Sequence, residues 1–126
     1  MSERRYINLP NRRLTLPFND AVLVGDTLYI SGRLGLGPDG KIASEPPEEE
    51  ARLILEGFKS VLHEAGMTLD DMVSVQIYCS DVSLFDKWNA VYVKYFTGSL
   101  PSRAFLGSGP LLFGARFEMV GIAVKR

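Results

Sequence analysis

Two charged residues in the C-terminal quarter of the sequence have neighbours that are unusual for a charge. Glu118 interrupts an apolar run typical of a buried strand, and Arg103 follows Pro101 at the start of a shorter β-type run. A buried carboxylate is costly without a partner, so Glu118 should have a cation or hydrogen-bond donors nearby. Arg103 supplies that cation if the two runs are adjacent antiparallel strands. The pair is then either a structural ion pair that fixes the sheet register or a site facing a pocket, and periodicity favours neither.

Other reactive side chains are too few for the common catalytic constellations. His63 is the only histidine and Cys79 the only cysteine, which excludes an internal disulfide and a His/Cys metal cage. We expect His63 to be a surface helix residue and Cys79 a core thiol. The sequence has no P-loop and no complete dinucleotide-binding fingerprint. We therefore predict no metal and no cofactor, and a hydrolytic reaction here has to proceed without either.

Length and composition predict one folded domain spanning residues 1–126. Of the 126 residues, 46% are hydrophobic and 23% charged, an ordinary globular balance. The net charge of −1 weighs against a protein that coats nucleic acid or anionic membranes. No apolar segment has the length of a signal sequence or a membrane span, so we expect a soluble, cytoplasmic protein. We interpret the N-terminal arginines (Arg4, Arg5, Arg12 and Arg13) as a solvated arm.

The elements that must position Arg103 and Glu118 follow from the apolar spacing. Strands are predicted at 22–24, 28–30, 72–79, 103–106 and 115–124, and helices at 48–65 and 83–96. This β-β-α-β-α-β-β order predicts an α+β domain in which two helices cover one face of the sheet. The last strand is apolar on both faces, so the second face also needs a cover. Because no third helix is predicted, self-association is the economical solution.

Five stretches of the sequence resemble the Rid family, also called the YjgF family, of reactive enamine/imine deaminases. They are 16–21 (LPFNDA), 24–32 (VGDTLYISG), 88–92 (WNAVY), 101–103 (PSR) and 117–124 (FEMVGIAV). The resemblance extends from about residue 14 to residue 126. Its most specific part is the combination of a Pro-x-Arg motif with a terminal Glu-x-x-x-Ile-Ala strand.

The resemblance implies a chorismate-mutase-like α+β fold with a mixed sheet, a homotrimer, and active sites in clefts between subunits. It assigns Arg103 to the substrate carboxylate, Glu118 to the hydrolytic water, and Gly32 to main-chain contacts with the substrate. Asn89 is placed with the substrate-binding residues. The implied reaction converts a 2-imino acid or enamine to a 2-keto acid and ammonia. Arginine suits its role because its planar donor fork matches a carboxylate.

Three positions depart from the usual family pattern. Phe18 stands where a tyrosine is usual, Arg33 replaces a glutamine after the Ser-Gly pair, and Phe105 replaces a small residue or cysteine. Phe18 and Phe105 are therefore expected to line the substrate site with apolar surface. The retained Arg103 and Glu118 favour acid binding and hydrolysis, whereas these changes weigh against the standard small substrates of the family.

Two other functions remain open from the sequence. The chain could be a non-catalytic trimer that binds small carboxylic acids through Arg103, or a nucleic-acid-processing protein, since some relatives have been labelled ribonucleases or translation inhibitors. Glu118 favours catalysis because binding alone needs no acidic residue in the pocket. The charge balance disfavours nucleic acid as a partner.

Overall fold

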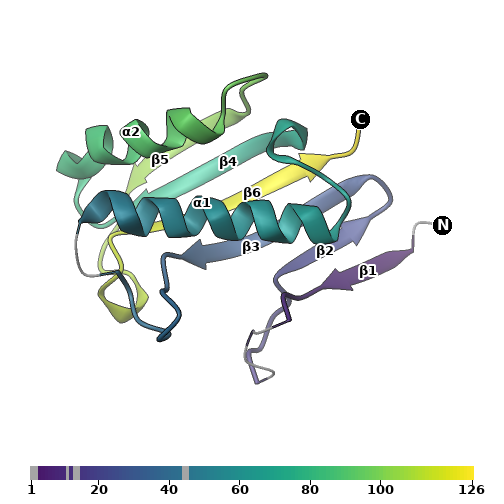
Figure 1. Cartoon of the computed structure of the whole chain (residues 1–126), viewed down its shortest axis with the longest axis horizontal. Coiled ribbons are helices and arrows are strands. Elements are labelled where there is room, and N and C mark those ends of the chain that lie inside the picture. Colours follow the sequence, from purple (N-terminus) through teal and green to yellow (C-terminus); the bar gives the residue numbers. More distant parts are fainter. Residues whose placement is uncertain (1–2, 11, 13–14, 44–45) are drawn as a thin grey trace.

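Two helices, α1 (Pro47–Glu64) and α2 (Phe85–Tyr95), lie across one face of a mixed β-sheet in the computed structural model (Figure 1). The structure describes residues 3–10, 12, 15–43 and 46–126. Within them the sheet has six strands, namely β1 (Arg4–Ile7), β2 (Ala21–Val24), β3 (Thr27–Leu34), β4 (Met72–Cys79), β5 (Ser102–Gly107) and β6 (Phe117–Val124). Their spatial order is β1-β2-β3-β6-β4-β5. Short 3-10 helices at Leu69–Asp71, Val82–Leu84 and Leu112–Gly114 precede β4, α2 and β6.

The helix α1 forms where its sequence predicts it. Pro47 fits the first turn, because the missing amide would have no partner there, and three glutamates that follow face the positive end of the helix dipole. Its apolar stripe is buried against the sheet and comprises Ala51, Ile54, Leu55, Phe58, Val61 and Leu62. Gly66 ends the helix with a φ of 72°, a conformation that favours glycine. The core therefore lies between α1, α2 and the covered face of the sheet.

The strand β5 joins the sheet through a crossover connection. It pairs in parallel with β4, and α2 connects the two strands. A helix is the usual connection between parallel neighbours because the chain has to return to the same end of the sheet. The crossover places β5 at the sheet edge under α2, and β6 inserts between β3 and β4 instead of beside β5.

The central strand β6 buries only one of its two apolar faces. Phe117, Met119 and Ala123 are fully buried on the helix-covered side. On the other side Val120 and Ile122 are half-buried, and Tyr29, which pairs with Ile122, is 50% exposed. The prediction that two helices leave one apolar sheet face without a cover is thus confirmed for a single chain.

The N-terminal strand β1 is absent from the sequence-based prediction, which interpreted the arginines there as a solvated arm. Arg4 and Arg5 lie in this strand, which pairs antiparallel with β2. Only Ile7 of its four residues is buried, so the edge strand has too weak an apolar pattern to be recognised. Arg12 is also not a solvated residue, because its guanidinium pairs with Asp20. Arg13 lies outside the described residues.

Candidate functional site

The guanidinium of Arg103 is oriented from several sides by α2. Its Nη1 donates a hydrogen bond of 2.7 Å to Asn89 Oδ1. The guanidinium carbon lies 4.8 Å from the centroid of the Tyr92 ring, within the usual range of a cation–π contact. Burial raises the pKa of the Tyr92 phenol, although the Arg103 cation opposes the shift. Arg103 is an exposed residue, and its guanidinium has N–H donors beyond the one that Asn89 uses.

Two phenylalanines complete the surroundings of Arg103. Its guanidinium carbon lies 5.7 Å from the Phe85 ring centroid and 5.9 Å from that of Phe105. The two rings meet edge to face, with centroids 5.0 Å apart. Phe105 is among the site residues predicted from the sequence, whereas Phe85 and Tyr92 are not. The signal was present in their spacing, because Phe85, Asn89 and Tyr92 recur every three to four residues and so share one face of a helix.

Gly32 and Glu118 form a second group of predicted site residues, on β3 and β6. The register of the two strands shifts between Ile30 and Arg33, so Gly32 lies in a β-bulge. A Cβ at Gly32 would collide with the Glu118 carboxylate and would lie 3.1 Å from its Cδ. Glycine therefore allows the carboxylate of Glu118 to lie directly over the strand. Bulges of this kind are common beside active sites because they redirect a side chain.

The two groups do not meet within one chain, which excludes the arrangement, left open by the sequence, in which adjacent antiparallel strands pair Arg103 with Glu118. Strand β4 separates β5 from β6. Arg103 pairs with Val75, and Val75 pairs with Gly121, so these three share the helix-covered face. Glu118 is displaced from Gly121 by an odd number of residues along β6 and projects from the opposite face. Among the described residues of one chain, the ion pair that was one of the two alternatives from the sequence is absent.

Phe18 lies in the segment that precedes β2. The residue is 48% exposed, and its ring centroid lies 5.5 Å from the guanidinium carbon of Arg12. The segment is held to β3 by a 2.6 Å hydrogen bond from Ser31 Oγ to Asn19 O. Asp20, the buried carboxylate of this segment, accepts a hydrogen bond from the Leu9 amide and pairs with Arg12.

Arg33 reaches the same carboxylate from β3. Its Nη1 lies 3.6 Å from Asp20 Oδ1, and its guanidinium occupies the space above Gly57 of α1. Burial lowers the pKa of Arg33, and the Asp20 charge opposes that shift. Arg33 thus connects β3 to the segment that carries Phe18.

The remaining reactive residues keep the roles expected from the sequence. Cys79 is fully buried, its thiol donates to Asp81 O at 3.0 Å, and burial raises its pKa. A buried thiol of this kind is a poor nucleophile, as predicted. His63 is exposed on α1, also as predicted.

Across the part of the chain that the structure describes, no group of three or more His, Cys, Asp or Glu side chains could hold a metal ion. In that same part, no helix is long and apolar enough to cross a membrane.

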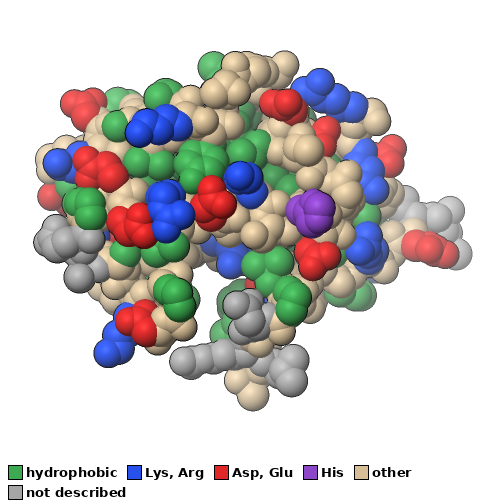
Figure 2. All heavy atoms as spheres, in the orientation of Figure 1, with side chains coloured by type: hydrophobic (Ala, Val, Ile, Leu, Met, Phe, Trp, Pro, Cys, Tyr) green, Lys and Arg blue, Asp and Glu red, His purple; other side chains and the backbone are tan. Residues whose placement is uncertain are grey.

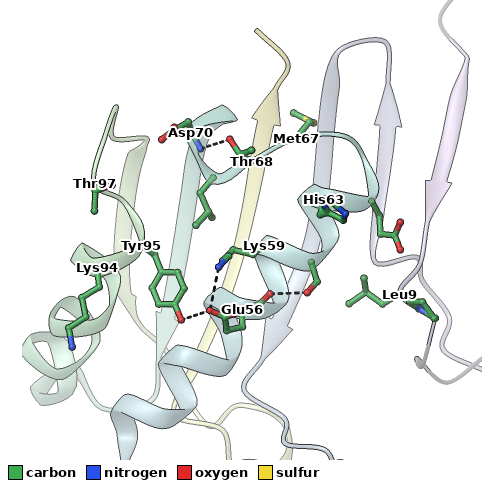
Figure 3. A pocket seen from close by; sticks show the side chains of 14 residues that line it. Leu9, Glu56, Lys59, His63, Met67, Thr68, Asp70, Lys94, Tyr95 and Thr97 are labelled. Carbon is green, nitrogen blue, oxygen red and sulfur yellow. Dashed lines mark hydrogen bonds and ion pairs between the residues drawn. The ribbon is translucent and has the colours of Figure 1, made fainter.

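A groove of about 880 Å³ runs beside the C-terminal half of α1 (Figure 3). Tyr95 from the end of α2 donates a 2.6 Å hydrogen bond to Glu56 of α1. Lys59 and His63 lie farther along α1 (Figure 3). Burial and Glu56 together raise the pKa of Tyr95 to about 12. None of the six predicted site residues lines this groove. It is therefore separate from the Arg103 and Glu118 groups.

Comparison with known proteins identifies the family. The model of the family described as Endoribonuclease L-PSP matches residues 11–125. The chain belongs to this family, that of the YjgF/Rid proteins. A RutC family protein of Pyrococcus abyssi is 34% identical over 86% of this chain and 87% of its own length. The human 2-iminobutanoate/2-iminopropanoate deaminase is 33% identical over 86% of this chain and 80% of its own length.

The solved structures confirm the predicted fold class. A Rid family protein from Yersinia pestis superimposes with a TM-score of 0.90 at 28% identity, and the match covers 98% of this chain and all of that one. The α+β architecture with two helices on one face of a mixed sheet is therefore the fold of the Rid family.

Proposed function

We propose that this Rid protein is a hydrolytic deaminase, with residues 1–126 acting as one domain. Its substrates are 2-imino acids and the enamines in equilibrium with them, and its products are 2-keto acids and ammonia. The observation that carries the proposal is the Arg103 guanidinium, which Asn89 and Tyr92 orient and which has N–H donors beyond the one that Asn89 uses. The name of the human relative, a 2-iminobutanoate/2-iminopropanoate deaminase, supports the substrate class.

The proposed mechanism uses one residue for binding and one for water. Arg103 binds the substrate carboxylate through parallel N–H donors and fixes the position of the C=N carbon. Water adds to this carbon of the protonated imine, while Glu118 orients the water and accepts its proton. Glu118 returns that proton to the amino group of the resulting carbinolamine. The C–N bond then breaks as the hydroxyl group gives up its proton to Glu118 and becomes the carbonyl, so ammonia leaves and the 2-keto acid remains. Glu118 suits this role because its half-buried carboxylate has no hydrogen bond or ion pair with any other described residue.

The opposite orientations of Arg103 and Glu118 support a site shared between subunits of a homotrimer. No single chain can present both side chains to one small substrate, because they project from opposite faces of the sheet. The apolar face that carries Glu118 is also the face that no helix covers. Packing this face against other copies buries its apolar side chains and brings Glu118 to the Arg103 group of a neighbour.

The variant Glu118→Gln tests the proposed function. It keeps the shape of the side chain but loses the proton acceptor, so imine hydrolysis should fall by roughly 10²–10⁴-fold, the usual share of a general base. An amino acid oxidase generates the imine in the assay, and ammonia release above the uncatalysed rate is measured. Glu64→Gln, which changes an exposed glutamate of α1, serves as the matched control and should retain full activity. Wild-type protein that never exceeds the uncatalysed rate on a panel of imines would rule the proposal out.

The second candidate is a non-catalytic binder of small carboxylic acids. It is favoured by one observation, that Arg103, Asn89 and the surrounding rings are assembled within a single chain. Titration of 2-keto acids separates the two functions, because a pure binder shows affinity without hydrolysis.

A nucleic-acid-processing function has less support. On the helix-covered face, Lys and Arg side chains are interspersed with Asp and Glu and form no basic stripe (Figure 2). The net charge of −1 also provides no excess of cations for a phosphate backbone.

A further inference from the structure

Glu50 is a buried carboxylate that the proposed mechanism does not use. It lies in the first turns of α1 and its side chain is fully buried. Oε2 accepts hydrogen bonds from the backbone amides of Arg116 at 2.8 Å and of Phe117 at 3.1 Å. Oε1 accepts a third bond, of 2.7 Å, from Arg116 Nε. The three donors satisfy the carboxylate, and all belong to the two residues that immediately precede Glu118.

The segment that Glu50 holds is also fixed by other contacts. Arg116 Nη2 donates to the carbonyl of Ala43 at 2.7 Å, and the carbonyl of Arg116 accepts a 3.0 Å bond from the Ser80 amide. Gly35, just beyond β3, lies so close that an added Cβ would be 2.6 Å from Glu50 Cγ. Glu50 thus connects α1 to the end of β3 and to the start of β6, the two strands that carry Gly32 and Glu118.

We propose that Glu50 is a positioning residue that sets the orientation of Glu118 by holding the Arg116–Phe117 peptide, and this rests on the proposed function. Glu118 follows Phe117 directly, so a rotation of the held peptide is transmitted to the Glu118 side chain. Its carboxylate has to lie over Gly32 to meet the water, and a displacement of about 1 Å can reduce a rate by two orders of magnitude. The affinity for substrate is set elsewhere, by Arg103 on β5.

An amide cannot replace this carboxylate without a clash of donors. In the variant Glu50→Gln, the amide oxygen can still accept both backbone N–H groups at the position of Oε2. The amide N–H₂ group then faces Arg116 Nε, which is itself a donor. Adding Arg116→Gln removes the clash, because the second amide can turn its oxygen toward the first. The double variant should therefore recover the position that the single variant loses.

The experiment compares kcat and KM for imine hydrolysis in wild type, Glu50→Gln, and the double variant Glu50→Gln/Arg116→Gln. We expect kcat to fall by roughly 10- to 100-fold in Glu50→Gln, since Glu118 is displaced. KM should stay within about twofold, because the Arg103 group is untouched. The double variant should regain most of the lost kcat. Glu49→Gln is the matched control, one residue away on the exposed face of α1, where it pairs with Arg52. It should behave as wild type.

The outcomes separate this inference from the proposed function. A wild type without hydrolysis overturns both. An active wild type whose Glu50→Gln variant has a lower thermal midpoint but an unchanged kcat, measured well below that midpoint, overturns the positioning role alone. A rise in KM equal to the loss in kcat, or a double variant worse than the single one, also overturns it. Faster hydrogen exchange at the Phe117 amide in Glu50→Gln, together with the kcat loss and its recovery, supports it.

Discussion

Arg103 differs from an ordinary surface arginine because its guanidinium is held before any ligand arrives. An exposed arginine loses side-chain freedom on binding, which costs free energy. Here the Asn89 hydrogen bond and the Tyr92 ring already restrict the side chain. The restriction favours ligands whose acceptor atoms match the planar N–H donors of the guanidinium, as the two oxygens of a carboxylate do.

Replacing Arg103 by lysine tests this preorganisation. Lysine keeps the positive charge but has neither the planar fork nor the extended contact with the Tyr92 ring. We expect binding of a 2-keto acid to weaken by about 1.5–3 kcal/mol, the range of a hydrogen bond to a charged group. Isothermal titration measures the loss. Arg52→Lys, at an exposed arginine that pairs with Glu49, is the control and should bind as wild type. Equal affinity of Arg103→Lys and wild type would contradict the assignment of the carboxylate site.

Gly32→Ala tests whether the bulge positions Glu118. The added methyl group collides with the end of the Glu118 side chain, which can rotate away, so the fold should persist with a nearly unchanged thermal midpoint. The displaced carboxylate should then lower imine hydrolysis by roughly 10- to 100-fold. Gly109→Ala is a suitable control, because an added Cβ there meets no atom within 4 Å. Full activity of Gly32→Ala would show that Glu118 does not need its place over the strand.

Apolar periodicity predicts some of the helices and strands correctly but does not predict β1. The helix predicted at 48–65 occurs at Pro47–Glu64, and the strand predicted at 72–79 occurs at the same residues. Both have many buried apolar residues at a regular period, so local pattern determines them. The strand β1 buries only Ile7, and no local pattern distinguishes it from an exposed arm.

The order of the strands in the sheet is the second feature that the sequence does not determine, and it decides how the site residues are arranged. The sequence allows the last two strands to be antiparallel neighbours, yet β6 inserts between β3 and β4. Pairing between distant strands depends on the packing of the whole sheet, which periodicity does not encode. The crossover helix α2 was the available signal, since a strand–helix–strand unit favours parallel pairing of β4 with β5. Candidate site residues could thus be named from the sequence, but not their division into two groups.

At the scale of the whole molecule, one face of the sheet is apolar and no helix of the chain covers it. Val120→Asp places a charge in the middle of this face, opposite Gln76 of β4. A charge buried in an apolar interface without a partner is costly, so the variant should dissociate. Sedimentation equilibrium should show wild type near three times the 14.0 kDa chain mass and the variant near a single mass. Val93→Asp makes the same change at a 61% exposed position on α2 and should leave the trimer intact. A monomeric wild type at micromolar concentration would contradict the prediction.

A mixing experiment tests whether neighbouring copies share the site. Arg103→Ala and Glu118→Gln should each be inactive as pure trimers, because every site lacks one of its two residues. When the two variants are unfolded, mixed in equal amounts and refolded, mixed trimers form. In a ring where Arg103 of one copy meets Glu118 of the next, about a quarter of the sites then receive both intact residues. We expect ammonia release to recover to about a quarter of the wild-type rate, because only these sites are complete. If both residues of a site came from one chain, every site would keep its defect, and the mixture would stay as inactive as its components.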